Sequence, residues 1–229
     1  MSLLLQIETA TTSCSVALAK DGIVLGLKQI NQRNIHAEVI TLFVEELLVS
    51  AGLKYDELDA IAVSSGPGSY TGLRIGISTA KGLCFALDKP LIAIETLESM
   101  AYGLINSYGA LDNHMLLCPM IDARRMEVFT AVFTAKGVKI KPTAAEIIDV
   151  NSFNELLEIN KMLFFGDGAE KCRDVLGAHP NAGFLPDFVN SATHLTQMAL
   201  EKFRNRAFEN VAYFEPYYLK DFIAGKKAL

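Results

Sequence analysis

The sequence has few residues that could hold a metal ion or cross-link the chain. Its four cysteines are far apart, and no two have the close spacing of a zinc knuckle or a redox motif. Each stands among apolar neighbours, so we expect reduced cysteines in a protein core. Its four histidines are also separated, with no pair at the spacing of a helical metal site. These residues are Cys14, Cys84, Cys118, Cys172, His36, His114, His179 and His194.

Long apolar runs and a basic leader are absent too. No stretch reaches the roughly 18 to 20 apolar residues of a membrane-spanning helix. The opening MSLLLQIETATTSCSVAL has no basic region before its apolar run, which predicts a first strand and not a signal peptide. The formal net charge of −5 argues against an autonomous nucleic-acid binder, so a partner would have to supply a basic surface for RNA. We expect a cytoplasmic protein without membrane contact.

Hydrophobic periodicity predicts an alternation of strands and helices that occurs twice. In the first half we expect strands at 3–8, 14–20, 23–30, 60–64 and 90–94 and helices at 36–51, 71–87 and 96–108. In the second half we expect strands at 116–121, 127–134, 138–140 and 162–165 and helices at 153–159, 169–176 and 193–208. The pairs Asp21-Gly22 and Lys136-Gly137 are typical of two-residue hairpin turns.

This order of elements predicts an α/β fold of two lobes. Residues 1–108 form the predicted N-terminal lobe and 109–209 the C-terminal lobe, with 210–229 returning to the first. Three antiparallel strands followed by alternating helices and strands, present twice, suggest the duplicated ribonuclease-H-like architecture of actin and the sugar kinases. The halves share the order of elements and no visible sequence identity.

The segment SSGPGSYTGLRIGISTAKGL, residues 64–83, joins a strand to a helix and carries the most information. A glycine-rich turn at a helix start presents unpaired N–H groups, which often bind anions. However, the phosphate-loop pattern is missing, and Lys81 lies about 2.5 turns into the helix, too far from a phosphate at its start. Ser69 also lacks the second flanking glycine of a nucleophile elbow. The residues alone therefore favour a structural turn over phosphate binding.

The helix in this segment carries small residues, Gly72, Gly76 and Ala80, on one face. Glycine inside a helix costs about 0.5–1 kcal/mol relative to alanine, so two of them indicate close approach to a neighbour. That neighbour is either the helix's own sheet or a helix of another subunit, and both can hold on different faces. For another subunit, the candidate contact residues are Gly72, Leu73, Arg74, Gly76, Ile77, Ala80, Lys81 and Cys84.

Four segments make the chain similar to the TsaB (YeaZ) family over nearly its full length. They are IETATTSCSVAL near the start, the glycine-rich segment, MIDARRMEVF at 120–129 and EPYYLK at 215–220. The resemblance implies a fold of the ASKHA superfamily, which includes actin, sugar kinases and Hsp70. It also implies a non-catalytic scaffold or activator that binds the catalytic paralogue TsaD. With the ATPase subunit TsaE, that complex makes threonylcarbamoyladenosine beside the anticodon of tRNA.

Further expectations about partners follow from the same resemblance. The chain reaches tRNA only through the complex and forms a homodimer when alone. It has no cofactor of its own, and ATP or ADP is expected only at the interface of the complex.

The resemblance also implies that the paralogue's active site is missing here. That enzyme holds a metal with a His-x-x-x-His pair on a helix, and the matching positions in this chain are Thr96 and Met100. Neither side chain can replace an imidazole ligand, and Glu98 alone cannot hold a catalytic metal. We therefore expect no enzyme activity. The alternative is an enzyme of the same fold, either metallopeptidase-like or a small-molecule kinase or ATPase.

Two pairs of residues are candidates for contact with a nucleotide. Glu8 and Thr9 end the first strand, where related folds often hold magnesium and nucleotide, although a tight polar turn fits equally well. Gly166 and Gly168 lie between a strand and a helix, but the charge of Asp167 between them disfavours a phosphate. A turn with Asp167 as a helix cap is the favoured interpretation.

Overall fold

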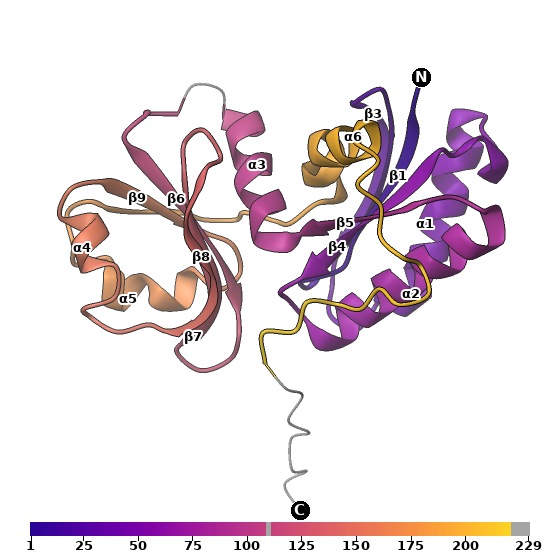
Figure 1. The fold of residues 1–229 in the computed structure, drawn as a ribbon. Coiled ribbons are helices and arrows are strands. Elements are labelled where there is room, and N and C mark those ends of the chain that lie inside the picture. The colour runs from indigo at the N-terminus through magenta and orange to yellow at the C-terminus, as the bar shows by residue number, and fades with distance from the viewer. Residues whose placement is uncertain (109–110, 221–229) are drawn as a thin grey trace, which may run out of the picture.

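The protein folds into two lobes that lie side by side, as Figure 1 shows for the computed structural model. The structure describes residues 1–108 and 111–220 of the 229-residue chain. Each lobe contains one five-stranded sheet, and the two sheets have equivalent strand orders. This arrangement is the duplicated ribonuclease-H-like architecture that the order of elements predicted.

The first sheet has the strand order β3-β2-β1-β4-β5. β1 runs antiparallel to β2 and parallel to β4, which is parallel to β5, so the carboxyl ends of these three parallel strands meet at one edge. The turn between β2 and β3 has positive φ at Asp21 and Gly22, 51° and 84°, as a two-residue hairpin requires. The strands are β1 (Leu3–Glu8), β2 (Ser13–Lys20), β3 (Ile23–Asn31), β4 (Ala60–Gly66) and β5 (Leu91–Glu95).

Two helices, α1 (His36–Ala51) and α2 (Tyr70–Leu87), cover one face of this sheet. Because successive side chains of a strand point to opposite faces, Leu3, Leu5 and Ile7 of β1 share a core with these helices. The intervening Leu4 belongs to a separate cluster on the other face. A short 3-10 turn, η1 (Tyr55–Glu57), precedes β4.

The second sheet has the order β8-β7-β6-β9-β10. One of its faces is covered by the single-turn helices α4 (Asn154–Leu157) and α5 (Arg173–Leu176). The strands are β6 (Met115–Asp122), β7 (Glu127–Thr134), β8 (Lys139–Ile147), β9 (Lys161–Phe165) and β10 (Ala182–Leu185). This half of the chain also contains two 3-10 turns, η2 (Glu170–Cys172) and η3 (Ala192–Leu195).

Each half of the chain contributes a helix to the sheet of the other half. Helix α3 (Thr96–Tyr108) shares a core with β6, β7 and β9, and helix α6 (Thr196–Arg204) shares one with β1, β4 and β5. The predicted lobes, residues 1–108 and 109–209, placed α3 in the first lobe and α6 in the second, so the packing of these two helices differs from that division. Periodicity shows that a helix has an apolar face and does not show which sheet that face covers.

The tail, described as far as residue 220, runs back along the first lobe (Figure 1). Glu209 forms an antiparallel bridge with Leu91 at the edge of β5. Lys81 of α2 donates from Nζ to the carbonyl oxygens of Ala212 and Phe214 at 3.3 and 3.0 Å. The rest of the predicted returning segment, 221–229, lies outside the described residues.

Several predicted elements differ in extent from those observed. β8 continues through Pro142 to residue 147, which an edge strand tolerates because one of its sides needs no ladder hydrogen bonds. β10 occupies part of what read as a loop, 179–186. The helix expected at 153–159 is a single turn, and the one expected at 193–208 is η3 followed by α6.

The four cysteines are buried and free, as expected. Burial raises the pKa of the Cys14, Cys84 and Cys118 thiols to about 12, so these thiols are inert near neutral pH. Within the described residues, no helix combines the length and apolar character needed to cross a membrane.

Candidate functional site

The turn between β1 and β2, residues 9–12, packs directly against the glycine-rich segment. A Cβ atom added at Gly72 would overlap the carbonyl oxygen of Thr9, and one added at Gly76 would overlap the Thr9 hydroxyl. A Cβ at Gly68 would overlap the carbonyl oxygen of Ala10. The three glycines are therefore needed for the close approach of the chain's own turn. The small-residue face of α2 is an internal packing surface.

Backbone N–H groups around the start of α2 form hydrogen bonds within the chain. Ser69 donates its N–H to the carbonyl oxygen of Ala10 at 2.7 Å, and its Oγ accepts the N–H of Gly72 at 3.2 Å. On the other side of the segment, Tyr217 of the tail donates to the carbonyl oxygen of Ser65 at 2.7 Å. The segment is thus a structural turn, the interpretation that its residues favoured over a phosphate site.

Glu8 ends β1 beneath this turn and is fully buried. Its Oε1 accepts hydrogen bonds from the N–H of Ala10 at 2.6 Å and from Ser64 Oγ at 3.0 Å. Its Oε2 and the neighbouring Asn190 Nδ2 have no hydrogen-bond partner of good geometry among the described residues. Burial raises the pKa of Glu8 to about 7, although these hydrogen bonds and Asn190 act to lower it. Burial therefore disfavours the ionised form that would have to hold magnesium.

Thr96 and Met100, which the resemblance matched to metal-binding histidines of the paralogue, both make contacts within the chain. Thr96 Oγ1 accepts the N–H of Gly66 at 3.2 Å and so ties the start of α3 to the glycine-rich segment. Met100 is buried in the core that α3 forms with the second sheet. Its Cε lies where a side chain at Gly166 would be, 2.6 Å from an added Cβ. Both side chains are thus engaged in contacts within the chain.

A cavity of about 40 Å³ remains between the lobes, beside Thr11 and Asn190. That volume suits a few water molecules, whereas sites for drug-sized ligands span about 300–1,000 Å³. Of the four candidate nucleotide residues, only Gly166 lines it, and Glu8 and Thr9 are buried behind the turn. In this arrangement the four residues do not enclose a space of nucleotide size.

The second glycine pair is packed against β6. A Cβ at Gly168 would come within 2.8 Å of the backbone of Ile121. Asp167, expected to cap the following helix, instead accepts a hydrogen bond from the N–H of Asp122 at 3.0 Å, and η2 has no side-chain cap. Burial raises the pKa of Asp167. Gly166 and Gly168 thus let this loop lie against the end of β6.

The histidines have packing roles where the structure gives them contacts. His36 Nε2 lies 3.0 Å from the carbonyl oxygen of Thr11, and the ring of His194 lies over Gly103 of α3. Burial lowers the pKa of His194 to about 4. In the described part of the chain, no group of three or more His, Cys, Asp and Glu side chains is arranged to hold a metal ion.

Most of the residues predicted to contact a partner are inside the first lobe. Arg74 and Lys81 reach the surface, on the side of α2 that the tail follows. Arg74 Nε donates to the Tyr218 hydroxyl at 3.1 Å, and its guanidinium lies over the ring of Tyr70 at 4.2 Å. The remaining six are buried and cannot meet a partner in this arrangement: Gly72, Leu73, Gly76, Ile77, Ala80 and Cys84.

The opposite face of α2 is open, and the sequence-based prediction missed it. A Cβ added at Gly82 would meet nothing within 4 Å, and Phe85 is 86% exposed. On the neighbouring helix α1, Leu42 and Val49 are also exposed. The signal was present in the sequence, since Gly82 and Phe85 are out of phase with the apolar stripe that contains Leu73.

Comparisons with known proteins agree with this architecture. The family model described as "TsaD: tRNA N6-adenosine threonylcarbamoyltransferase" matches residues 26–226. The chain is 30% identical over 233 residues to "tRNA threonylcarbamoyladenosine biosynthesis protein TsaB" of Escherichia coli, covering 98% of this chain and 97% of that protein. It is 39% identical over 117 residues to a tRNA N6-adenosine threonylcarbamoyltransferase of Staphylococcus epidermidis, covering 44% of this chain and 34% of that protein.

Among solved structures, YeaZ from Pseudomonas aeruginosa superposes with a TM-score of 0.81 at 27% identity. The match covers 96% of this chain and 100% of that one. Similarity to the proteins named TsaB and YeaZ thus runs the length of the chain, while similarity to this transferase covers a part. The ASKHA-type fold that the resemblance implied is confirmed.

Proposed function

Because the chain belongs to the TsaB family of tRNA threonylcarbamoyladenosine biosynthesis proteins, we propose that it is the non-catalytic partner subunit of the transferase TsaD. In this role it acts as a scaffold or activator, and TsaD transfers the threonylcarbamoyl group to the adenosine beside the anticodon. The chain itself contributes neither a metal nor a nucleophile to the reaction.

The observation that carries this proposal is what fills positions 96 and 100. Thr96 is engaged with Gly66, and Met100 is core, so neither can act as a metal ligand without a loss of packing. The raised pKa of Glu8 and the small volume between the lobes also weigh against a catalytic centre of the chain's own. These features are what a subunit that supports another subunit's chemistry requires.

The docking surface that we propose for TsaD is the outer face of α2 and α1, defined by Ser78, Gly82 and Phe85 with Leu42 and Val49. Complete burial of Phe85 would contribute about 1.5–3 kcal/mol to association. Gly82 lets the backbone of a partner helix come close. A C2 homodimer of the isolated chain uses the same face. This replaces the buried face of α2 as the predicted contact.

The remaining partners follow from that arrangement. The ATPase subunit TsaE joins the complex, and tRNA binds the assembled complex, to which the partners contribute the main basic surface because this chain has a net charge of −5. Any ATP or ADP lies at the interface with a partner, where a second subunit can supply the missing walls of a site. The complex works in the cytoplasm.

The test is reconstitution of tRNA threonylcarbamoylation from purified components, with this chain, without it, and with Gly82→Arg. The substitution adds a long side chain where nothing lies within 4 Å, so the isolated variant should fold with at least wild-type stability. We expect it to lose both binding to TsaD and the ability to support modification.

Ala178→Arg is the matched control, because it adds the same charge at an exposed position of the second lobe. It should retain binding and activity. Full modification without the chain would refute the subunit role. Normal TsaD binding by Gly82→Arg would leave that role intact and place the interface elsewhere. One equivalent of metal in the purified chain, or turnover by the chain alone, would favour the alternative of an ASKHA-fold enzyme.

A further inference from the structure

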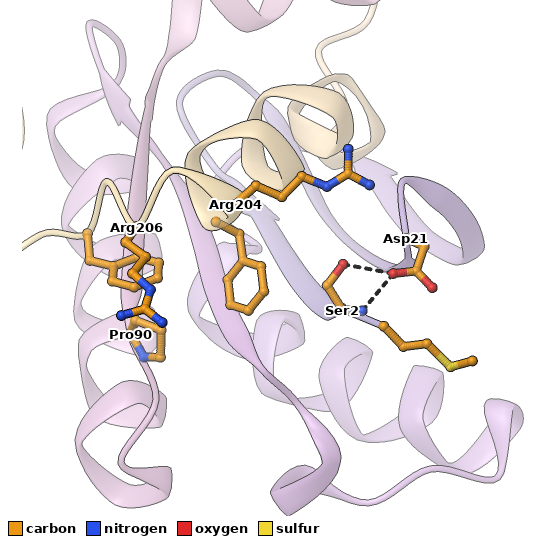
Figure 2. A pocket seen from close by; sticks show the side chains of 8 residues that line it. Ser2, Asp21, Pro90, Arg204 and Arg206 are labelled. Atoms are coloured by element: carbon orange, nitrogen blue, oxygen red, sulfur yellow. Dashed lines mark hydrogen bonds between the residues drawn. The ribbon is translucent and has the colours of Figure 1, made fainter.

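A cavity of about 550 Å³ opens at the end of the first lobe, away from the glycine-rich segment. Its walls come from the start of β1, the β2–β3 turn, the residue before β5 and the end of α6 (Figure 2). Its volume lies within the usual range for small-molecule sites. It is separate from the proposed docking surface, and nothing in the subunit role uses it. The lining residues are Met1, Ser2, Asp21, Pro90, Phe203, Arg204, Arg206 and Phe208.

Two guanidinium groups stand at this cavity without a direct ion pair. Among residues 1–108 and 111–220, neither Arg204 nor Arg206 makes an ion pair or a side-chain hydrogen bond. The acid of the cavity, Asp21, is already engaged, since its Oδ1 accepts the N–H of Ser2 at 2.7 Å and its hydroxyl at 3.2 Å. Figure 2 shows Arg204 reaching toward the Asp21 side and Arg206 lying beside Pro90. The uncompensated positive charge is therefore on the Arg206 side.

The backbone of Arg206 is unusual for arginine. Its φ is 53°, and it follows α6 at the position where helices most often have glycine. The N–H of Ala207 donates to the carbonyl oxygen of Lys202 at 2.9 Å, which completes the cap whatever side chain is present. Helix termination therefore gives no reason for arginine here, where glycine would adopt the same backbone with less strain.

The same end of the cavity has an aromatic wall. The ring centroids of Phe203 and Phe208 are 6.0 Å apart, and Phe208 is 39% exposed. A partly exposed ring beside a free guanidinium matches a ligand with a planar ring and an anionic group, because the ring can stack while the guanidinium binds phosphate through paired N–H groups.

We propose that this cavity binds a nucleotide unit, with its phosphate at Arg206 and its base against Phe208. The unit comes either from a free nucleotide or from an RNA strand, and the two sources share this chemistry. The site lies on the chain itself, so it is tested on the isolated protein and independently of TsaD.

The experiment is a calorimetric titration of the purified chain with adenosine 5′-monophosphate, with inorganic phosphate and with a single-stranded RNA of about ten nucleotides. We expect saturable one-site binding that is at least about tenfold weaker in Arg206→Gly and in Phe208→Ala. Since glycine suits the left-handed backbone, the melting temperature of Arg206→Gly should equal or exceed that of wild type. Arg206→Asn, which also tolerates this conformation, is a second test of the charge.

Arg33→Gln is the charge-matched control, since Arg33 is exposed and lies outside the cavity. It should bind like wild type. Tighter binding of the RNA identifies RNA as the source, and tighter binding of the mononucleotide identifies the free form. The proposal is overturned if no probe saturates, or if both Arg206 variants bind as tightly as wild type. Equal affinity for phosphate and the mononucleotide would show that the base is not bound and would overturn the proposed contact with Phe208.

Discussion

Replacing Glu8 with glutamine tests the electrostatic cost of burying this carboxyl. Glutamine keeps the shape of the side chain and an acceptor for the N–H of Ala10 and the hydroxyl of Ser64. It removes the charge that burial disfavours. We therefore expect Glu8→Gln to stabilise the protein at neutral pH and to have little effect in mild acid.

The sign and size follow from the pKa of Glu8, which folding raises from 4.5 to about 7. A carboxyl that holds its proton more tightly when folded stabilises the protein most below pH 4.5. This stabilisation decreases as the pH rises from 4.5 to 7, and above that range the loss no longer grows. At about 1.4 kcal/mol per pH unit, the loss amounts to about 3 kcal/mol. For a chain of this length that is on the order of 10 °C in melting temperature.

The assay is urea unfolding of wild type and Glu8→Gln at a series of pH values from 4.5 to 8. The difference in free energy of unfolding should grow toward neutral pH in favour of the variant, and other titrating groups cancel because both proteins contain them. Glu158→Gln, which removes an exposed carboxylate of the second lobe, is the control. A constant difference across the series would refute the reasoning that the buried acid is uncompensated.

Four further substitutions test the packing and one surface contact. Gly76→Ala should destabilise the protein by at least about 1–3 kcal/mol in urea unfolding, because its Cβ would overlap Thr9. Gly82→Ala on the open face should instead stabilise it by about 0.5–1 kcal/mol. If Gly82→Ala were the less stable of the two, the assignment of the buried and open faces of α2 would be wrong. Met100→Ala should cost about 2–5 kcal/mol in the same assay through the cavity left between α3 and the second sheet. Tyr218→Phe, which removes an exposed hydrogen bond to Arg74, should change stability by less than about 1 kcal/mol, measured by thermal melting.

The sequence predicted the elements of the first lobe well because their signals are local. The stripe of Val44, Leu47 and Leu48 specifies the buried face of α1, and Asp21-Gly22 specifies a hairpin turn. It predicted the second lobe less well, where β10 has only four residues and lies at the sheet edge. β10 has only partly buried residues and no alternation strong enough to identify it.

The features of the candidate site depend on contacts between distant segments, and a single sequence does not specify these. The raised pKa of Glu8 depends on its burial beneath the β1–β2 turn, and the Thr96 bond spans 30 residues. The exchange of α3 and α6 between the sheets is of the same kind. What the sequence did indicate was the absence of imidazole at positions 96 and 100, and the structure adds what those side chains do instead.

The glycines of α2 differ in whether a contact within the chain explains them. Each costs about 0.5–1 kcal/mol relative to alanine in a helix. Gly72 and Gly76 are explained by the turn at Thr9, which leaves no room for a side chain. Gly82 has no such explanation within the part of the chain that the structure describes, because its missing side chain would meet open space beside the exposed Phe85. A close approach by another polypeptide is a physical reason that remains for glycine at this position. For the same reason, Gly82→Arg tests the interface without disturbing the packing inside the chain.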